Sequence, residues 1–547
     1  MSQGLARLLV PWPERRVLCD DSELLVIDKL PGMPVHGGDE SAGDDLVGRL
    51  KARDLARGGE RYLGIHQRLD QDVSGLLFLN RNPAHNRELA RDSERRAIRR
   101  QYLAVVSQAE SLAAQGTLEH SLVAVKGAQS RVVERGGQRA ITHFSVRARL
   151  GERALVELSL ETGRKHQIRA QLAAIGAPVA GDALYGGEPA PRLMLHCTKL
   201  HLPTFDRSFE SQPPHYLSEW LARGSLLIPE DPGPALEDAG CLRWRLSGKA
   251  SALRLVNADA DLLPGVVVEV YGEFATLSLS TREALEHKAE LGNALVTKGA
   301  SGVYAKLRLR TDLRRKSVTE LAPPQPIAGT EAPKPLVISE QDMKLGVDLA
   351  DGLSTGLFVD QRDNRARVRA ASRGLRVLNL FAYTCSFSVA AALGGAREVV
   401  SVDLSKRALE RGKRNFELNG LPLEPHRFVV DDAVKWLKRA ARRGQSFDLA
   451  IVDPPSFSTS GKGTFSVASG YLGLLEGVFD VLGKGAKLLA VTNHQKTSQA
   501  QLRAMLGKAA RAKGREIVSL KSLKAGVDCR VGAPHESPTK SVWVSLR

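Results

Sequence analysis

Four short segments in the first part of the chain place charged and aromatic side chains beside apolar runs. Arg68 and Asp70 stand just before an apolar run that starts at Gly75. An Arg–Asp pair of this kind is by itself typical of an exposed ion pair, which contributes little. Three further segments follow in order: RRQYLAVV with Tyr102, ETGRKHQIR ending at Arg169, and PVAGDALYG. Because a carboxylate can act as a nucleophile or a base without any cofactor, Asp70 is a candidate catalytic residue.

In this order the four segments resemble the RluA-type family of pseudouridine synthases, over residues 15–205. The resemblance implies an α+β fold with a mixed sheet, and isomerisation of a uridine that has been turned out of its RNA stack. It also implies roles for five residues: Asp70 is the catalytic carboxylate, Arg169 pairs with it, Arg68 holds the RNA backbone or fills the gap left by the flipped base, Tyr102 stacks on the base and can take the carbon-bound proton, and Ile168 packs beneath the base pocket.

The segment around Asp70 departs from the family signature H-R-L-D-x-x-T-S-G in two places. Gln67 is inserted between His66 and Arg68, and Val73 replaces the threonine. The spacing from the arginine to the following Ser-Gly pair is unchanged, so we expect the catalytic loop to keep its form. The role of the histidine stays open.

Acidic residues follow three successive strands in the last third of the chain, at Asp403, at Asp431 with Asp432, and at Asp453. Strand-like and helical stretches alternate there, which predicts an α/β unit with a doubly wound, Rossmann-like sheet. Each acid taken singly is typical of a helix N-cap. As an ordered set at the carboxyl edge of one sheet, the acids favour a nucleoside ligand. The turn after the first strand lacks G-x-G, which argues against a dinucleotide.

The segment DPPSF, together with GLSTGLFVDQRDNR upstream, makes residues 250–547 resemble the large-subunit rRNA methyltransferases of the RlmI/RlmK type. The resemblance implies a class I methyltransferase fold, with S-adenosylmethionine as the cofactor and a nitrogenous base as the target. It places nine residues near the cofactor: Asn379, Phe381, Tyr383, Thr384, Asp403, Asp431, Asp432, Gln361 and Arg362. It places four at the base, with Asp453 as the catalytic acceptor: Asp453, Pro454, Pro455 and Phe457. Asn493, on the turn after the fifth strand, is our candidate for a polar contact to the base.

The methylated atom is inferred from the cysteines. Members of this family that methylate cytosine carbon 5 need a cysteine thiolate on the turn after the fifth strand or beside the D-P-P segment. These positions read VTNHQK and DPPS, and Cys385 and Cys529 lie elsewhere in the sequence. We therefore expect a guanine nitrogen, with N7 as the family precedent, while cytosine carbon 5 remains the alternative.

The elements that position these residues divide the chain into three units. Short alternating apolar runs predict a mixed, largely antiparallel sheet for the first unit. A proline-rich and acidic stretch from 203 to 238 is predicted to be a linker with one short helix. The expected boundaries are 1–235 for the synthase domain with its linker, 236–340 for a small α+β middle domain that could bind RNA, and 341–547 for the methyltransferase domain.

The chain has 547 residues and a formal net charge of +17, which attracts polyanions. Basic residues cluster at 91–100, 306–316 and 438–443, so we expect RNA, ribosomal RNA above all, as the partner. Five scattered cysteines without a CxxC pair favour a reducing cytoplasm and neither disulfides nor a metal site. No apolar run is long enough for a membrane span.

These observations predict a cytoplasmic enzyme with two RNA-modifying active sites, one of which needs S-adenosylmethionine. An alternative is an enzyme with one catalytic half whose other half serves as an RNA-binding platform.

Overall fold

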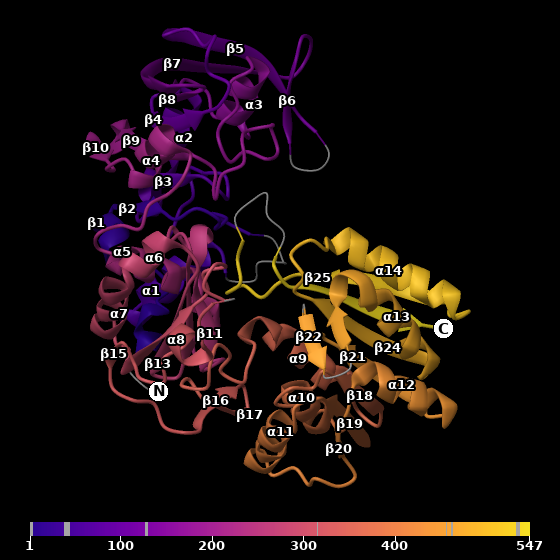
Figure 1. Ribbon diagram of the computed structural model, residues 1–547. Coiled ribbons are helices and arrows are strands. Elements are labelled where there is room, and N and C mark those ends of the chain that lie inside the picture. The colour runs from indigo at the N-terminus through magenta and orange to yellow at the C-terminus, as the bar shows by residue number, and fades with distance from the viewer. Residues whose placement is uncertain are drawn as a thin grey trace.

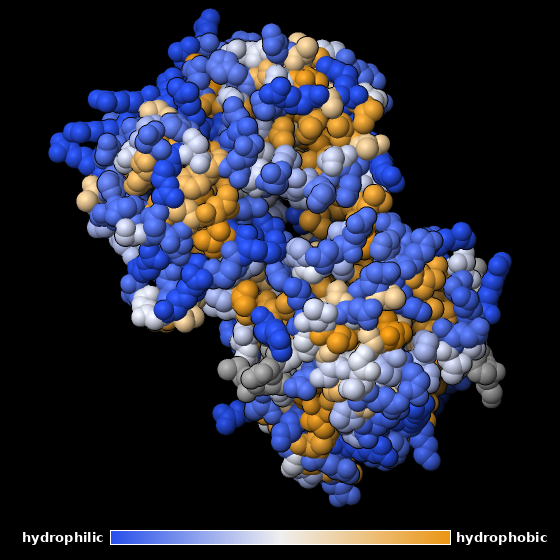
Figure 2. Space-filling model, turned by 90° about the vertical axis from the view of Figure 1, so that its left-hand side faces the viewer, coloured by the Kyte–Doolittle hydropathy of each residue, from blue (hydrophilic) through white to orange (hydrophobic). Residues whose placement is uncertain are grey.

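The computed structural model describes residues 4–37, 44–125, 129–313, 315–455, 457–460, 463–531 and 537–547. Three large sheets follow one another along the chain, and Figure 1 shows them as an upper, a lower left and a lower right part. Hydrophilic residues cover most of the face in Figure 2, with apolar patches scattered between them. Within the described ranges, no helix is long and apolar enough to cross a membrane.

The first unit is built on a ten-stranded sheet in the order β1-β2-β3-β9-β4-β8-β7-β5-β6, with β10 added to β9. Its strand pairs are antiparallel except β3 with β9, which confirms the predicted mixed sheet. The strands are β1 Val17–Asp20, β2 Leu24–Lys29, β3 Ser74–Asn80, β4 Arg99–Val106, β5 Gln115–Ala124, β6 Ser130–Val133, β7 Gln138–Leu150, β8 Arg153–Leu160, β9 Leu195–Leu202 and β10 Arg207–Glu210.

The described residues of this unit form four α-helices: α1 Leu46–Ala56, α2 Asn86–Glu94, α3 Gln167–Ala174 and α4 His215–Arg223. The stretch predicted as a linker is more ordered than expected, because it forms the 3-10 helix η5 Pro203–Phe205, strand β10 and helix α4. Tyr216 and Trp220 of α4 lie on one helix face and are buried in the core of the first unit. A helix with such an apolar face gains stability by packing on the sheet, which a free linker would not do.

The middle unit contains a five-stranded sheet in the order β11-β12-β13-β14-β15. Its strands are β11 Ala252–Asn257, β12 Val266–Tyr271, β13 Phe274–Leu279, β14 Gly302–Leu307 and β15 Ala328–Gly329, and its helices are α5 Gly233–Leu242, α6 Arg282–Glu286, α7 Lys288–Thr297 and α8 Val318–Leu321. Leu5, Leu8 and Leu9 near the start of the chain are buried in the core of this unit. The expected boundary at 235 assigns these three leucines to the first domain, although their side chains pack in the core of the middle unit.

A seven-stranded sheet in the order β20-β19-β18-β21-β24-β26-β25 forms the last unit, after the hairpin of β16 Leu336–Glu340 and β17 Met343–Val347. Among the described strands of this sheet every pair is parallel except those that β26 forms with β24 and β25, so the doubly wound prediction is confirmed. The strands are β18 Arg376–Leu380, β19 Glu398–Asp403, β20 Arg427–Val430, β21 Phe447–Val452, β24 Leu482–Thr492, β25 Ile517–Leu523 and β26 Lys540–Leu546, with the hairpin β22 Phe457–Ser460 and β23 Gly463–Ser466.

Helices pack on both faces of this sheet (Figure 1): α9 Arg362–Ala371, α10 Ser386–Leu393, α11 Lys406–Leu418, α12 Ala433–Arg442, α13 Val467–Asp480 and α14 Gln499–Ala512. The carboxyl ends of β18, β19, β20 and β21 meet at one edge, where ligands bind in sheets of this kind. The segment between β25 and β26 leaves the sheet, and Arg530 there contacts Asn257 of the middle unit and Gly32 of the first unit.

Candidate active sites

A cavity of about 1270 Å³ opens beside the ten-stranded sheet. Its wall is formed by the loop before β3, the start of α3, the segment from Gly181 to Leu193, and β4. The cavity is large enough to admit an extruded nucleotide with its neighbours. All five residues predicted for the first site line it: Arg68, Asp70, Tyr102, Ile168 and Arg169.

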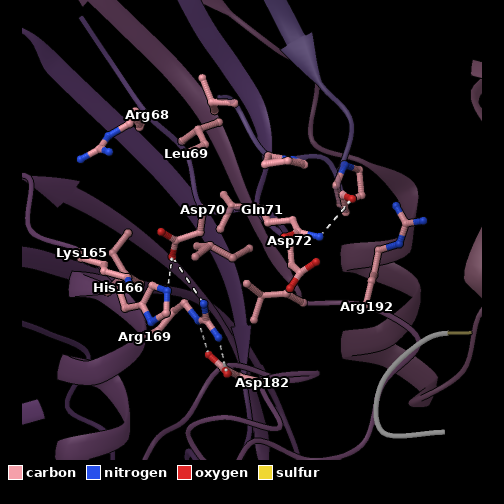
Figure 3. A pocket seen from close by; sticks show the side chains of 18 of the residues that line it. Arg68, Leu69, Asp70, Gln71, Asp72, Lys165, His166, Arg169, Asp182 and Arg192 are labelled. Atoms are coloured by element: carbon pink, nitrogen blue, oxygen red, sulfur yellow. Dashed lines mark hydrogen bonds and ion pairs between the residues drawn. The ribbon is translucent and has the colours of Figure 1, made fainter. Parts of the chain in front are cut away.

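The carboxylate of Asp70 points toward two side chains of the segment that starts α3 (Figure 3). Its Oδ2 lies 3.5 Å from Nη1 of Arg169 and 3.8 Å from Nε2 of His166. The Asp70 side chain is 26% exposed, and the residue lines the cavity. The carboxylate is thus held from one side and accessible to a ligand from the other.

Arg169 is oriented mainly by Asp182, whose side chain is completely buried. Its Nε and Nη2 donate to the two carboxylate oxygens of Asp182 at 2.6 and 2.8 Å. Burial lowers the pKa of Arg169, but the ion pairs with Asp182 and Asp70 outweigh it and hold the pKa above its ordinary value. Arg169 therefore contacts Asp70, as predicted, but at a longer distance than it contacts Asp182. The shorter ion pair with Asp182 orients the guanidinium toward Asp70.

His166 adopts the left-handed conformation, with φ 53°, immediately before α3. Its Nδ1 lies 3.1 Å from the hydroxyl of Tyr185. Burial lowers the pKa of His166, so the ring is largely neutral at pH 7. The sequence contains His166, Asp182 and Tyr185 within the two recognised segments, but the distances that bring them to Asp70 arise only in the fold.

Tyr102 and Ile168 form an apolar part of the wall, and each is 5% exposed. Burial raises the pKa of Tyr102 well above its ordinary range, so its hydroxyl keeps its proton at neutral pH. This state suits a ring that packs on a base better than one that accepts a proton. Arg68 extends away from Asp70, as Figure 3 shows, so the two side chains do not form an ion pair with each other.

Lys29 is completely buried beneath the loop that carries Asp70. Its Nζ donates to the carbonyl oxygens of Leu30, Met33 and Gln71 at 2.8, 2.9 and 3.0 Å. Burial lowers the pKa of Lys29 to about 7, although Asp72 and Asp70 oppose this effect. The ammonium group ties the end of β2 to the residue next to Asp70, and sequence inspection missed it.

The inserted residue of the signature segment, Gln67, packs against β3. Gln67 is buried, and its side-chain amide contacts the backbone of Leu76 and Phe78 at 3.4 and 3.3 Å. His66 instead lies 2.9 Å from the side-chain oxygen of Asn86. Gln67 therefore fastens the loop to the strand, while His66 contacts the first residue of α2.

A smaller cavity of about 250 Å³ lies at the carboxyl edge of the seven-stranded sheet. Nine of the residues predicted for the second site line it: Gln361, Phe381, Tyr383, Asp403, Asp431, Asp453, Pro454, Pro455 and Asn493. Phe358, which was not predicted, also lines the cavity and is half exposed, with its ring 5.8 Å from that of Tyr383. It belongs to the quoted segment GLFVDQR, but no pattern in that segment marks it.

The turn after β18 is shaped for close approach to a ligand. Phe381, Tyr383 and Cys385 all have positive φ, which is uncommon for residues with a side chain. The backbone N–H groups of Tyr383 and Ser405 donate to the two oxygens of Asp403, each at 2.8 Å. Each carboxylate oxygen keeps a further acceptor position, which suits the two hydroxyls of a ribose.

Asp453 directly follows β21 and lines the same cavity. Burial, with the nearby charge of Asp360, raises the pKa of Asp453 to about 7. Near neutral pH this carboxyl is present in both protonation states. It can therefore accept a hydrogen bond in one state and donate one in the other.

Comparison with known proteins places both halves. Residues 23–174 match the family model of RNA pseudouridylate synthases, and residues 256–518 match that of S-adenosylmethionine-dependent methyltransferases. The chain is 34% identical over 334 residues to ribosomal RNA large subunit methyltransferase I of Escherichia coli K12, covering 57% of this chain and 83% of the relative. The corresponding protein of Aeromonas salmonicida is 32% identical over 285 residues, covering 52% and 71%.

The chain belongs to the RlmI-type methyltransferases and carries an RluA-type pseudouridine synthase domain in front. A solved methyltransferase complexed with SAH is 31% identical, covers 59% of this chain and 82% of its own, and has a TM-score of 0.53. One from Streptococcus mutans is 30% identical, with 59% and 83% covered and a TM-score of 0.52. The chain thus joins an RNA pseudouridylate synthase domain to a methyltransferase domain that depends on S-adenosylmethionine.

Four residues predicted near the cofactor of this RlmI-type half lie behind the cavity wall. Asn379 donates to Ser388 in the core, and the hydroxyl of Thr384 donates to the carbonyl of Gly356. Asp432 is the N-cap of α12 and accepts the N–H of Lys435 at 2.9 Å. Arg362 binds the buried carboxylate of Asp528 at 2.7 and 3.0 Å. These four side chains form hydrogen bonds within the protein and do not line the cavity.

Asp431 and Phe457 are two further residues predicted for the site of the RlmI-type half. Asp431 lines the cavity and also forms an ion pair with Arg439 of α12. Phe457 begins β22, but its side chain lies outside the described part of the structure. Within the described ranges, no group of three or more His, Cys, Asp or Glu residues is arranged to hold a metal ion.

Proposed function

We propose that the cavity around Asp70 converts a uridine of ribosomal RNA to pseudouridine. In this isomerisation the bond from the ribose to the base nitrogen breaks, a bond to carbon 5 forms, and the proton on carbon 5 leaves. Asp70 acts at the sugar, as nucleophile or as base, and Arg169 stabilises its negative charge. The observation that carries the proposal is the accessible carboxylate of Asp70, which lies 3.5 Å from a guanidinium that Asp182 orients.

The remaining roles follow from placement. Tyr102 and Ile168 hold the flipped base, because they form the apolar wall beside the carboxylate. Arg68 binds the RNA backbone or occupies the space left by the base, because it extends away from Asp70 (Figure 3). His166, being largely neutral, contributes a polar contact near the carboxylate.

Tritium release from rRNA labelled at carbon 5 of uracil tests this assignment. The wild-type protein releases tritium, because carbon 5 exchanges its hydrogen for the bond to ribose. Asp70→Ala abolishes release while leaving methyl transfer to rRNA unchanged. Full tritium release by Asp70→Ala would refute the assignment of Asp70.

For the second cavity we propose methylation of a guanine nitrogen in 23S rRNA, with N7 as the preferred atom. S-adenosylmethionine supplies the electrophilic methyl group when bound. Asp403 and Asp431 hold its nucleoside part, and Gln361, Phe381 and Tyr383 surround it. Asp453, Pro454, Pro455 and Asn493 orient the target base, and the carboxyl of Asp453 accepts or donates the orienting hydrogen bond.

The choice of nitrogen is supported by the cysteines. None of the chain's five cysteines lines the second cavity. Burial raises the pKa of Cys385 to about 12, and it raises the pKa of Cys529 still further, so neither is a thiolate at neutral pH. Methylation of cytosine carbon 5 requires a thiolate to add to the ring first.

Mass spectrometry of nucleosides from rRNA of a deletion strain tests the target. We expect one methylated guanosine and one pseudouridine to disappear together and to return on complementation. Loss of 5-methylcytidine instead would favour the alternative atom. Loss of only one of the two marks would show that one half is catalytic and the other serves as an RNA-binding platform.

A further inference from the structure

An arginine from the methyltransferase half reaches the cavity that holds Asp70. Arg530 lies in the segment between β25 and β26, yet it lines the synthase cavity together with Gly32 and Asp72. Its Nη2 donates to the carbonyl oxygen of Gly32 at 3.2 Å. A Cβ atom on Gly32 would lie 1.8 Å from this nitrogen, so the close approach depends on glycine at this position. The methyltransferase half therefore completes a wall of the synthase cavity.

The segment that carries Arg530 is anchored before any ligand arrives. Asp528, two residues earlier, is completely buried and binds Arg362 of α9, and it also accepts the backbone N–H of Arg254 at 3.0 Å. The side chain of Asn257 donates to the carbonyl of Arg530 itself. Because these contacts fix the backbone, little conformational entropy is lost when the guanidinium binds a ligand.

Arg530 and a neighbouring arginine, Arg192, carry positive charge that few protein groups balance. In the described part of the chain, the Arg530 side chain makes a single hydrogen bond, to Gly32. Burial, with repulsion from Arg243 and Arg192, lowers its pKa, although Asp261 and Asp72 oppose this.

Arg192 lines the same cavity, and its buried Nε has no hydrogen-bond partner among the described residues. Its guanidinium rests over the ring of Tyr216, 4.9 Å from the centroid. A desolvated cation with unused donors gains most from an anion that accepts a charge-assisted hydrogen bond.

We propose that Arg530 and Arg192 bind a backbone phosphate of the RNA next to the target uridine, so that the methyltransferase half contributes substrate affinity to pseudouridine formation. The inference rests on the assignment of the cavity to pseudouridine synthesis. Guanidinium groups match phosphate oxygens in a bidentate manner. In Figure 3, Arg192 lies on the opposite side of Asp70 from Arg68 and Lys165. An RNA strand crossing the cavity would meet cations on both sides of the flipped nucleotide.

Steady-state kinetics and RNA binding of the full-length Arg530→Gln variant test the proposal. Glutamine can still donate to Gly32 but removes the charge. We expect the KM for unmodified rRNA to rise about tenfold while kcat changes less than about twofold, because one charge-assisted contact is lost and the catalytic groups stay in place. We also expect the slope of log Kd against log salt concentration to decrease by about 0.7, the value for one phosphate contact on a single strand.

Three variants serve as controls. Arg530→Lys keeps the charge and should retain the salt slope of the wild type. Arg511→Ala removes an exposed arginine of α14 in the same half and should leave both KM and slope unchanged. Arg192→Gln should reproduce the Arg530→Gln changes, since both side chains bind the same phosphate.

An unchanged KM and salt slope in Arg530→Gln would overturn the proposal. A fall in kcat at constant KM, or a lower unfolding temperature that Arg530→Lys does not restore, would show that Arg530 only supports the fold. Failure of the synthase assignment itself is distinguishable, because Asp70→Ala would then retain tritium release whatever Arg530 does.

Discussion

The cavity around Asp70 and the cavity around Asp403 hold their carboxylates by different contacts. Asp70 faces ionisable side chains, Arg169 and His166, and the first of these is oriented by a buried ion pair. Asp403 is held by backbone N–H groups at the turns after β18 and β19. Under the functions proposed for the two cavities, the first arrangement supplies the reacting groups from the protein, whereas the second binds a cofactor that carries the reacting group.

The two cavities also differ in size and in the charge of their lining residues. The synthase cavity measures about 1270 Å³ and the methyltransferase cavity about 250 Å³. Among the described residues, seven arginine and lysine side chains line the first: Arg68, Arg100, Arg164, Lys165, Arg169, Arg192 and Arg530. In the second, the only basic or acidic side chains among the described lining residues are acidic: Asp360, Asp403, Asp431 and Asp453. A polyanion fits the first lining, and a nucleoside attached to a cationic sulfonium fits the second.

Removing Arg169 should produce the largest effect and should break only the synthase side of this comparison. In Arg169→Met the buried carboxylate of Asp182 loses its partner, which costs about 3–5 kcal/mol of unfolding free energy. Tritium release should also fall by at least about a hundredfold, because Asp70 loses its cation. Denaturant unfolding and the tritium assay measure the two effects.

Arg147→Met is the matched control, since Arg147 of β7 forms an exposed ion pair with Glu157 and does not line the cavity. Methyl transfer by Arg169→Met should stay near the wild-type rate. If tritium release survived the loss of Arg169, the cation beside Asp70 would have no catalytic importance.

Replacing Asp403 should break only the methyltransferase side. In Asp403→Ala the ribose hydroxyls lose a charged acceptor, a contact that contributes about 1.5–3 kcal/mol. The Kd for S-adenosylmethionine in calorimetry should therefore rise about 10- to 100-fold, with pseudouridine formation unchanged.

Asp432→Ala sharpens this test, because the sequence places both acids at strand ends. As the N-cap of α12, Asp432 should cost about 1 kcal/mol of stability when removed but leave the Kd for the cofactor unchanged. Equal losses of affinity in the two variants would contradict the structural distinction between them.

Removing Lys29 should have a smaller effect, confined to the loop that carries Asp70. In Lys29→Met the carbonyl oxygens of Leu30, Met33 and Gln71 lose the amine that lies between them, which at pH 9 supplies two hydrogen bonds, and stability should fall by about 1–3 kcal/mol. Burial lowers the pKa of Lys29 to about 7, below its value of 10.5 in the unfolded chain, so the unfolded chain binds more protons between these values. The stability of the wild type should therefore rise with pH across this window.

The Lys29→Met variant should lack this part of the pH dependence. Lys51→Met, which removes an exposed lysine of α1, should keep it. If stability rose equally steeply with pH in the wild type and in Lys29→Met, burial would not lower the pKa of Lys29.

The fold class could be predicted because its signals are local. Strand and helix alternation from Arg376 onward reflects burial on both faces of a parallel sheet, which neighbouring residues record directly. The four synthase segments likewise carry their own residues into one cavity. Such features can be predicted from the sequence alone because each depends on a few consecutive residues.

Contacts between distant segments could not be predicted. Asp403 ends β19 and Asp432 follows β20, and only the backbone geometry makes one a ligand candidate and the other a helix cap. Arg530 reaches Gly32 across the whole chain, and no periodicity marks that contact. The apolar face of α4 was hidden for a different reason, since the prolines around it favoured a linker.

The stability of the methyltransferase unit should also depend on pH. Burial, with the charge of Asp360, raises the pKa of Asp453 to about 7, above its value of 3.8 in the unfolded chain. The folded unit therefore binds more protons between these values, and its stability should decline as the pH rises from 4 to 7. Asp453→Asn, which cannot titrate, should have a flatter profile, whereas Asp480→Asn on the exposed end of α13 should not. In calorimetry, the transition that S-adenosylmethionine shifts identifies the unit, and equal pH slopes for wild type and Asp453→Asn would mean that this carboxyl is solvated rather than buried.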